Sequence, residues 1–347
     1  MDLQSLLLRQ GNPSLRGERP DIVRPVLNMD RSQSLGELNE FRLAVLIPCY
    51  NEEVSVGATV ETFRNAIPSA TIYVYDNNSV DNTREVAAAA GAVVKQESRQ
   101  GKGNVVRRMF ADVDADIYVL VDGDATYDAQ AAPRLIKRLI DEELDFLNAA
   151  RVSEGIEAYR RGHRLGNIIL SGLVESIFGR QFRDMLSGYK VFSRRFVKSF
   201  PAMSRGFEIE TELTVHALEL RMPCAEELAP YKERAAGSTS KLSTYRDGFR
   251  ILILIASLVK NEHPFQFFGT VGFGLIILAA MLAVPLVETY IETGLVPRIP
   301  TAVLVVGMVI VGLLSWFAGL IMDVVTTARQ EAKRLAYLSF FPVRTKR

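Results

Sequence analysis

Two long apolar runs near the C-terminal end of the 347-residue chain most constrain how it can fold, because neither contains Asp, Glu, Lys or Arg. The first, HPFQFFGTVGFGLIILAAMLAVPLV, lies between Glu262 and Glu288, and the second, IPTAVLVVGMVIVGLLSWFAGLIM, lies between Arg298 and Asp323. At about 1.5 Å per residue, either run crosses a hydrocarbon core of about 30 Å as a helix. Two buried core helices are the alternative. Uncharged runs of this length are typical of membrane spans, so we expect a transmembrane hairpin over residues 264–325.

Basic residues around this hairpin predict its orientation. The joining segment ETYIETGLVPR has one basic residue, whereas the flanks contain Lys260 on one side and Arg329, Lys333, Arg334, Arg344, Lys346 and Arg347 on the other. The positive-inside rule then places both termini in the cytoplasm. We expect an integral membrane protein of the bacterial inner or plasma membrane type, with its large polar portion cytoplasmic.

The charges nearly cancel, with 41 basic and 40 acidic side chains and a net charge of +1. A dedicated nucleic-acid-binding protein usually shows a basic excess, so we expect no nucleic-acid partner. The two cysteines, Cys49 and Cys224, are far apart and have no metal-ligand spacing. This pattern favours a reducing compartment over a disulfide framework or a zinc site.

Strand and helix patterns alternate over about 110 residues. Short β-rich runs occupy residues 42–48, 70–79, 92–96, 115–124 and 145–151, and helical patterns occupy residues 52–67, 81–92, 103–113 and 131–143. This alternation predicts an α/β fold with a mostly parallel sheet and helices on both faces.

The rest of the chain divides by composition. Residues 1–40 are polar and proline-containing, and we expect an irregular N-terminal arm followed by a globular domain over residues 41–244. Residues 245–263 combine a nine-residue apolar run with charged ends. This run is too short to cross a membrane and predicts an interfacial amphipathic helix. Residues 326–347 are expected to form a basic cytoplasmic tail.

Polar side chains follow the predicted strands where each one ends. Tyr50, Asn51 and Glu52 follow the first strand, Asp76, Asn77 and Asn78 come at the end of the second, and Asp122 and Asp124 come at the end of the fourth. Ligands bind at the carboxyl ends of the strands in sheets of this kind. The sequence therefore predicts a ligand site at this edge.

The stretch VDGDATYD places Asp122 and Asp124 on one turn, where both can reach a hard cation such as Mg²⁺ or Mn²⁺. A solvated surface turn is the alternative. A calcium loop of the EF-hand type is excluded, because Tyr127 and Pro133 stand where glycine and glutamate are needed. Asp128 comes just before a helix and is interpreted as a helix-start residue.

Three further stretches allow more than one interpretation. The glycines around Lys102 favour either a phosphate-binding helix start or a plain turn. YKERAAGSTSKLSTYR, with Arg234 and Lys241, favours a phosphate clamp or a surface for anionic lipid. The acidic side chains of GFEIETELTVHALEL are interpreted only as a favourable helix start.

Seven motifs together are more specific than any one of them. LIPCYNEE, VYDNNSVDNT, GKG, VDGD, LSGYKVFSRR, GFEIETEL and RAAGSTSKL occur in the order found in family 2 glycosyltransferases. The chain, over about residues 42–325, resembles the polyprenyl-phosphate glycosyltransferases, relatives of dolichol-phosphate-mannose synthase. The resemblance implies a GT-A fold and inverting transfer of a sugar from a UDP- or GDP-sugar to an undecaprenyl- or dolichyl-type phosphate at the cytoplasmic membrane face. The lipid-linked monosaccharide would serve cell-envelope glycan assembly or glycosylation.

The resemblance also implies roles for individual residues. Asp122 and Asp124 would be the catalytic pair, and Asp76 would contact the base or ribose. The donor would be bound by Pro48, Tyr50, Glu52, Asp76, Lys102, Asp122, Gly123, Asp124 and Arg234. The acceptor phosphate would be bound by Arg151, Arg164 and Lys241, and Mg²⁺ or Mn²⁺ by Asp122, Asp124 and Thr126. This sequence departs from the family in having Asp76-Asn77 for Asp-Asp, Thr126 for a frequent glutamine, and one more residue between Arg234 and Lys241.

The acceptor in such a reaction is a phosphate monoester, which is already anionic near neutral pH. We therefore nominate no general base. A processive polysaccharide synthase of the same fold is one alternative, although it would need more spans and a base. A membrane-anchored, non-catalytic sugar-nucleotide-binding protein is the other. The sequence leaves the oligomeric state open, a homo-oligomer included.

Overall fold

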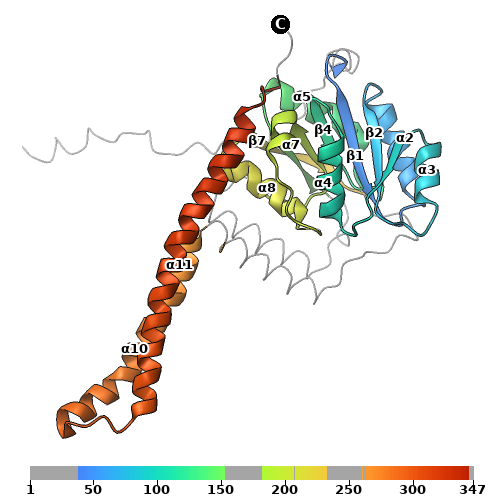
Figure 1. Cartoon of the computed structure of the whole chain (residues 1–347). Helices are drawn as coiled ribbons and strands as arrows, with labels where there is room; N and C mark the ends of the chain where they lie inside the picture. Colours follow the sequence, from blue (N-terminus) through green and yellow to red (C-terminus); the bar gives the residue numbers. More distant parts are fainter. Residues whose placement is uncertain (1–37, 153–181, 207, 233–259, 261–262, 344–347) are drawn as a thin grey trace, which may run out of the picture.

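The computed structural model describes residues 38–152, 182–206, 208–232, 260 and 263–343. A seven-stranded sheet in the order β3-β2-β1-β4-β6-β5-β7 forms its centre (Figure 1). β6 runs antiparallel to its neighbours β4 and β5, and the other pairs are parallel. The strands are β1 (Leu43–Cys49), β2 (Thr71–Asp76), β3 (Val93–Gln96), β4 (Ile117–Leu120), β5 (Phe146–Val152), β6 (Lys190–Ser193) and β7 (Cys224–Pro230). The predicted mostly parallel sheet is confirmed.

Helices cover both faces of this sheet, as predicted. α2 (Val56–Ala66), α3 (Thr83–Ala89) and α5 (Ala132–Asp141) share one buried apolar cluster, and α5 follows the short 3₁₀ helix η2 (Ala129–Ala131). α4 (Lys102–Asp112), α7 (Arg194–Ser199) and α8 (Ile209–Glu219) share the other. Local sequence explains the pattern: α5 buries Leu135, Ile136, Leu139 and Ile140, which lie on one side of a helix.

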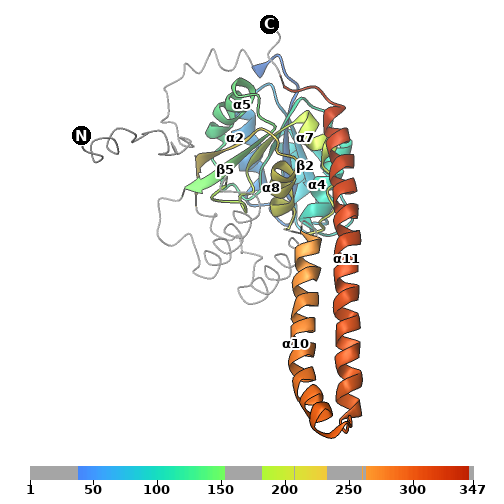
Figure 2. The same ribbon diagram turned by 90° about the vertical axis from the view of Figure 1, so that its left-hand side faces the viewer.

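Two long apolar helices follow, α10 (Pro264–Thr293) and α11 (Ile299–Leu338). Their apolar windows have mean hydropathies of 2.4 and 2.5, and only 17% and 11% of those windows is buried. Helices buried in a soluble core would be mostly covered, so this exposure argues against that alternative. Both are long and apolar enough to cross a membrane, and Figure 2 shows them side by side.

Glycines bring these two helices close together. A Cβ atom added to Gly272 would lie 2.6 Å from the Gly312 carbonyl oxygen, and one added to Gly312 would lie 2.9 Å from that of Gly272. The Trp316 indole N–H also donates to the Gly269 carbonyl, 3.0 Å away. Small residues at helix crossings are typical of membrane helix pairs.

α11 does not end where the apolar run ends. It continues past Asp323 to Leu338 and packs against α7 of the domain (Figures 1 and 2). The predicted boundary between hairpin and tail, at residues 325 and 326, therefore falls inside one continuous helix, and it stays a prediction of where the chain leaves the membrane. The predicted arm and surface helix fall largely on residues 1–37 and 233–259, which lie outside the described residues.

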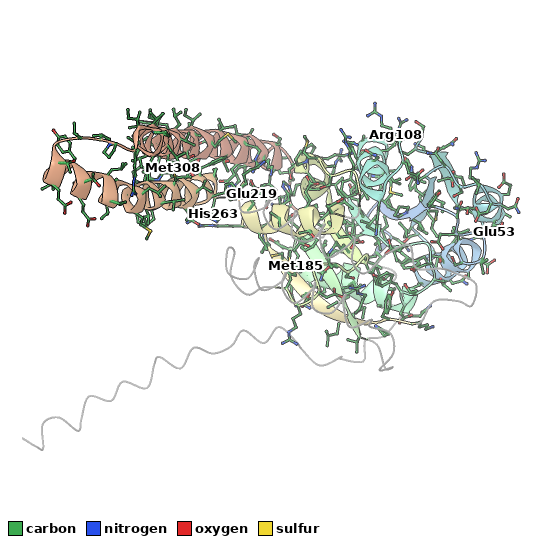
Figure 3. All side chains as sticks on the ribbon, turned by 90° about the horizontal axis from the view of Figure 1, so that it is seen from below. Glu53, Arg108, Met185, Glu219, His263 and Met308 are labelled. Carbon is green, nitrogen blue, oxygen red and sulfur yellow. The ribbon has the colours of Figure 1, made fainter. Side chains whose placement is uncertain are left out.

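The C-terminal part of α11 packs on the domain, and this packing determines which edge of the sheet faces the apolar part of α11. Moving away from that part, Lys333 pairs with Glu219 at the end of α8 (2.6 Å), and Tyr337 then donates to Asp145 (2.7 Å). Figure 3 labels Glu219 at the junction between the domain and the helix pair. Asp145 precedes β5 and so lies at the amino edge of the parallel strands. The carboxyl edge therefore lies on the side toward the apolar part of α11.

Candidate active site

The turn after β4 is held by neighbouring elements at this carboxyl edge. The Gly123 carbonyl accepts hydrogen bonds from the Ser55 hydroxyl (2.9 Å) and the Thr59 hydroxyl (3.3 Å). A Cβ atom on Gly123 would lie 2.5 Å from the Cys49 sulfur, so only glycine fits. Ala125 has a φ of 57°, which is uncommon for a residue with a side chain. The turn that presents Asp122 and Asp124 is thus sharply bent and tightly packed.

Asp124 is buried, and its carboxylate is oriented by Thr126. Asp124 Oδ1 accepts a hydrogen bond from the Thr126 hydroxyl (2.6 Å) and one from the Thr126 backbone N–H (3.3 Å). The predicted metal ligand Thr126 therefore lies beside Asp124, with its hydroxyl directed at that carboxylate. This arrangement gives Thr126 a clear role in aiming Asp124.

Asp122 and Asp124 are the hard oxygen donors that Mg²⁺ and Mn²⁺ prefer. Within the residues that the structure describes, no group of three or more His, Cys, Asp or Glu side chains is arranged to hold a metal ion. An ion on these two carboxylates would complete its shell with water and substrate oxygens, which is the usual arrangement for Mg²⁺ with phosphate substrates. The residues fit a cation that arrives with a phosphorylated donor.

Lys102 at the start of α4 lies between two carboxylates. Its ammonium is 2.5 Å from Asp122 Oδ1 and 2.6 Å from Glu210 Oε1, and the side chains of Lys102 and Glu210 are only 8% and 9% exposed. Burial alone would lower the pKa of Lys102, but Asp122 and Glu210 outweigh it and raise that pKa. Burial also raises the pKa of Glu210, against the opposing effect of Lys102. Lys102 is therefore a firmly charged ammonium.

Gly188 supports Asp122 from another side. A Cβ atom at position 188 would overlap the Asp122 carboxylate, with Oδ2 as its nearest atom. The Gly188 N–H donates to the Tyr127 hydroxyl (2.8 Å), which fixes the glycine in place. Lys102 and Gly188 together hold Asp122 in one orientation.

The glycines of the GKG motif serve backbone packing. Gly101 has a φ of 125°, and a Cβ atom on Gly101 or Gly103 would overlap the backbone carbonyls of Arg205 or Ser204. The Gly103 N–H donates to the carbonyls of Arg205 and Gly206, both at 3.1 Å. Both positions need glycine because the start of α4 passes close to the backbone of residues 204–206, and this close packing sets the position of Lys102.

Asp76 and Asn77 have different roles at the end of β2. Asp76 is fully buried, and its carboxylate accepts the Ser79 N–H at 3.2 Å. The Asn77 amide donates to the carbonyls of Glu97 (2.9 Å) and Arg99 (2.8 Å), and its oxygen accepts the Gly101 N–H (2.7 Å). An aspartate could not make these two donations. Asn77 thus orders the loop that leads to Lys102.

The remaining donor-site predictions lie at the same edge. Pro48 is part of β1 and pairs with Tyr75, and Tyr50 just beyond it is 37% exposed. The Glu52 N–H donates to the Thr83 hydroxyl (2.8 Å), and its carboxylate accepts from the Ser55 hydroxyl (3.2 Å). The sheet therefore brings Pro48, Tyr50, Glu52 and Asp76 to one edge with the turn after β4.

Arg151, a predicted acceptor-phosphate ligand, has a carboxylate partner. Its guanidinium donates to both oxygens of Asp184, at 2.7 and 2.8 Å, and lies 5.5 Å from the Tyr231 ring centre. Burial works against the charged form of Asp184, but Arg151 lowers the pKa of that carboxyl below its ordinary value. Arg164, Arg234 and Lys241 lie outside the described residues.

Sequence reasoning missed Glu210 and Gly188. The prediction of helix-start charges in residues 206–220 fits Glu212, which lies in the first turn of α8 and accepts the backbone N–H groups of Met203 and Ser204. Glu210 instead faces inward to Lys102. Its apolar neighbours Ile209 and Leu213 offered a signal, because a residue at that spacing shares their buried side.

Comparison with known proteins identifies the class. Residues 44–200 match the family described as "Glycosyl transferase family 2". The chain is 30% identical over 299 residues to Glycosyltransferase AglJ of Haloferax volcanii, a match covering 85% of this chain and 98% of that protein. The chain belongs to glycosyltransferase family 2, and it is a glycosyltransferase.

Two further similarities bear on the site. A Dolichyl-phosphate hexose transferase of Haloferax volcanii is 28% identical over 220 residues, covering 63% of this chain and 95% of that protein. Glucosyl-3-phosphoglycerate synthase of Mycobacterium tuberculosis, solved with Mn²⁺, UDP and glucosyl-3-phosphoglycerate, has a TM-score of 0.56 at 19% identity. That match covers 69% of this chain and 86% of the synthase and supports the predicted GT-A fold.

Proposed function

We propose that this glycosyltransferase moves a hexose from a UDP- or GDP-sugar to a polyprenyl phosphate at the cytoplasmic membrane face. Transfer is inverting and depends on Mg²⁺ or Mn²⁺. The product is a lipid-linked monosaccharide for cell-envelope glycan assembly or glycosylation. The observation that carries this proposal is the docking of α11, which joins the apolar helix pair rigidly to the domain and turns the carboxyl edge of the sheet toward it.

A lipid acceptor fits this arrangement for a geometric reason. The phosphate of a polyprenyl phosphate lies at the membrane surface, whereas its chain stays in the hydrocarbon. A site on the far edge of the domain would be separated from that phosphate by the height of the sheet. The site instead lies on the near edge, and tethering raises the local concentration of a membrane-bound acceptor. The Dolichyl-phosphate hexose transferase relative supports the same class of acceptor.

The residues at this edge of the sheet are suited to bind a nucleotide diphosphate. Asp122 and Asp124 would hold the divalent cation, which would offset the charge that develops on the leaving diphosphate. Thr126 aims Asp124, and Lys102 with Gly188 orients Asp122. These supports hold the carboxylates in place before the donor arrives.

The acceptor supplies its own nucleophile. A phosphate monoester carries negative charge near neutral pH, so it can attack the anomeric carbon without a protein base. The bond from the anomeric carbon to the diphosphate breaks as the bond to the acceptor phosphate forms, and attack from the opposite side inverts the configuration.

A donor screen tests the proposal. The purified full chain, in lipid nanodiscs with undecaprenyl phosphate and Mn²⁺, is incubated with individual UDP- and GDP-sugars, and lipid products are identified by mass. We expect one hexose per lipid and, by NMR, an anomeric configuration opposite to that of the donor. A long polymer would instead identify a processive synthase. Nucleotide-sugar binding without a product from any tested donor would favour a non-catalytic binding protein.

A further inference from the structure

Glu210 is a buried acidic residue that has no role in the proposed transfer of a sugar to a polyprenyl phosphate. It lies in the first turn of α8, and its carboxylate is 2.6 Å from the Lys102 ammonium, which in turn is 2.5 Å from Asp122. Three segments far apart in the sequence thus meet at one ammonium. Burying a carboxylate is unfavourable unless it is paired, and an apolar side chain would fill the same space at less cost. The pair of Glu210 with Lys102 therefore points to a role beyond packing.

The pairing determines where Lys102 points. A lysine side chain has four rotatable carbon–carbon bonds and carries its charge at the tip, so a single partner leaves it free to turn. A donor diphosphate arriving beside Asp122 and Asp124 would compete for this ammonium. Glu210, opposite Asp122, supplies a second fixed negative charge that holds Lys102 in line. The three groups then carry one net negative charge.

We propose that Glu210 is a positioning residue that keeps Lys102 on Asp122 and away from the donor diphosphate. Asp122 then meets the nucleotide in one orientation, because Oδ1 is engaged by Lys102 and Oδ2 is closely packed against Gly188. Lys102, predicted from the sequence as a direct donor ligand, orients a donor ligand in this arrangement. The inference rests on use of a nucleotide-diphosphate donor, whatever the acceptor is.

Glu210→Gln tests this role, because the amide can still accept a hydrogen bond from Lys102 but carries no charge. Lys102 then has one charged partner, Asp122, instead of two, and can turn toward the diphosphate. We expect GDP or UDP, whichever binds the parent with Mn²⁺, to bind the variant about 3- to 10-fold more tightly in calorimetry, while kcat falls about 10-fold or more. Glu208→Gln, two residues away, removes the same charge with no contact to Lys102 and should match the parent in both measurements.

A double variant separates positioning from direct action. If Glu210 acts only through Lys102, adding Glu210→Gln to Lys102→Met should change kcat by less than about 2-fold relative to Lys102→Met alone. Additive losses would overturn the proposal, as would a parental kcat in Glu210→Gln. Weaker nucleotide binding together with a lower melting temperature would show a merely structural role.

Two further measurements keep the proposal testable. If Glu210→Gln does not fold, Glu210→Asp keeps the charge at a shorter reach and should show the same divergence of binding and kcat in milder form; parental values for both would overturn the proposal. The nucleotide-binding measurement needs no acceptor. A failure to find lipid product in the parent would therefore count against the proposed function, whereas unchanged nucleotide affinity in Glu210→Gln would count against the role of Glu210.

Discussion

Tyr337, near the end of α11, donates a hydrogen bond to Asp145, a residue 192 positions earlier in the chain. Asp145 is fully buried just before β5, and it also accepts from Ser193 (2.6 Å) and pairs with Arg195. The Arg195 guanidinium lies 4.7 Å from the Tyr337 ring centre. The apolar helix pair is thus joined to the catalytic domain by a buried polar cluster at the edge farthest from the site.

Tyr337→Phe should weaken this joint. The variant keeps the ring but leaves the buried Asp145 carboxylate with one fewer donor, which costs about 2 kcal/mol. We expect a melting temperature lower by a few degrees in detergent-purified protein. Tyr290→Phe, an exposed tyrosine on α10, should melt like the parent. Equal melting of all three proteins would show that the hydrogen bond does not stabilise the docked helix.

Asp124→Asn should nearly abolish sugar transfer without unfolding the protein. Loss of the charge removes a cation ligand, and we expect turnover to fall about 100-fold or more at saturating Mn²⁺. Asp128→Asn is a matched change in the same stretch. Asp128 accepts the Gln130 N–H at the start of η2, and asparagine can cap that start equally well, so activity should stay near the parental value. Near-normal turnover in Asp124→Asn would contradict the metal role.

Thr126→Val should slow transfer by releasing Asp124. Valine has nearly the same shape but no hydroxyl, so Asp124 Oδ1 loses its 2.6 Å hydrogen bond. We expect kcat to fall about 10-fold and the Mn²⁺ requirement to rise, as for other groups that orient metal ligands. Thr126→Ser restores the hydroxyl and should recover most of the rate. If serine and valine were equally slow, the hydroxyl would not be the cause.

His216 should make stability fall in acid. Burial, with a smaller effect of Lys333, lowers the pKa of His216 from 6.5 to about 3. Between these two pKa values His216 is protonated in the unfolded chain but neutral in the folded chain. The free energy of unfolding therefore falls as pH falls from 6.5 toward 3, by up to about 1.4 kcal/mol per pH unit. His216→Leu should flatten that slope, because leucine binds no proton. The Ser199 hydroxyl, which contacts the His216 ring, keeps its hydrogen bond to the Phe196 carbonyl in this variant. Parallel pH profiles of the parent and variant would contradict this.

The sequence was sufficient to predict the first five strands of the sheet because their signals are local. The first five strands were located within a few residues, since each is a short apolar run closed by turn residues. β6 and β7 were missed. Both lie beyond the stretch of about 110 residues in which strand and helix patterns alternate, and β7 alternates irregularly through Glu226 and Glu227.

The site was predicted in part for the same reason. Motifs placed Asp76, Asp122 and Asp124 at strand ends, and parallel pairing of β1 with β2 and β4 brings those ends to one edge. Contacts such as those of Lys102 with Glu210 and of Asn77 with Gly101 join segments whose separation no local pattern encodes. The continuation of α11 to Leu338 was not predicted, because a change from apolar to charged residues marks the edge of a membrane and not the end of a helix.

The continuous helix from Asp323 to Leu338 imposes an angular condition on the protein. Each residue of an α-helix advances about 1.5 Å and turns about 100°. Removing one residue between Asp323 and Lys333 would therefore move the domain only slightly but swing Lys333 and Tyr337 away from Glu219 and Asp145. Only insertions or deletions close to whole turns keep both pairs aligned, so the length of this segment is restricted to steps of three or four residues.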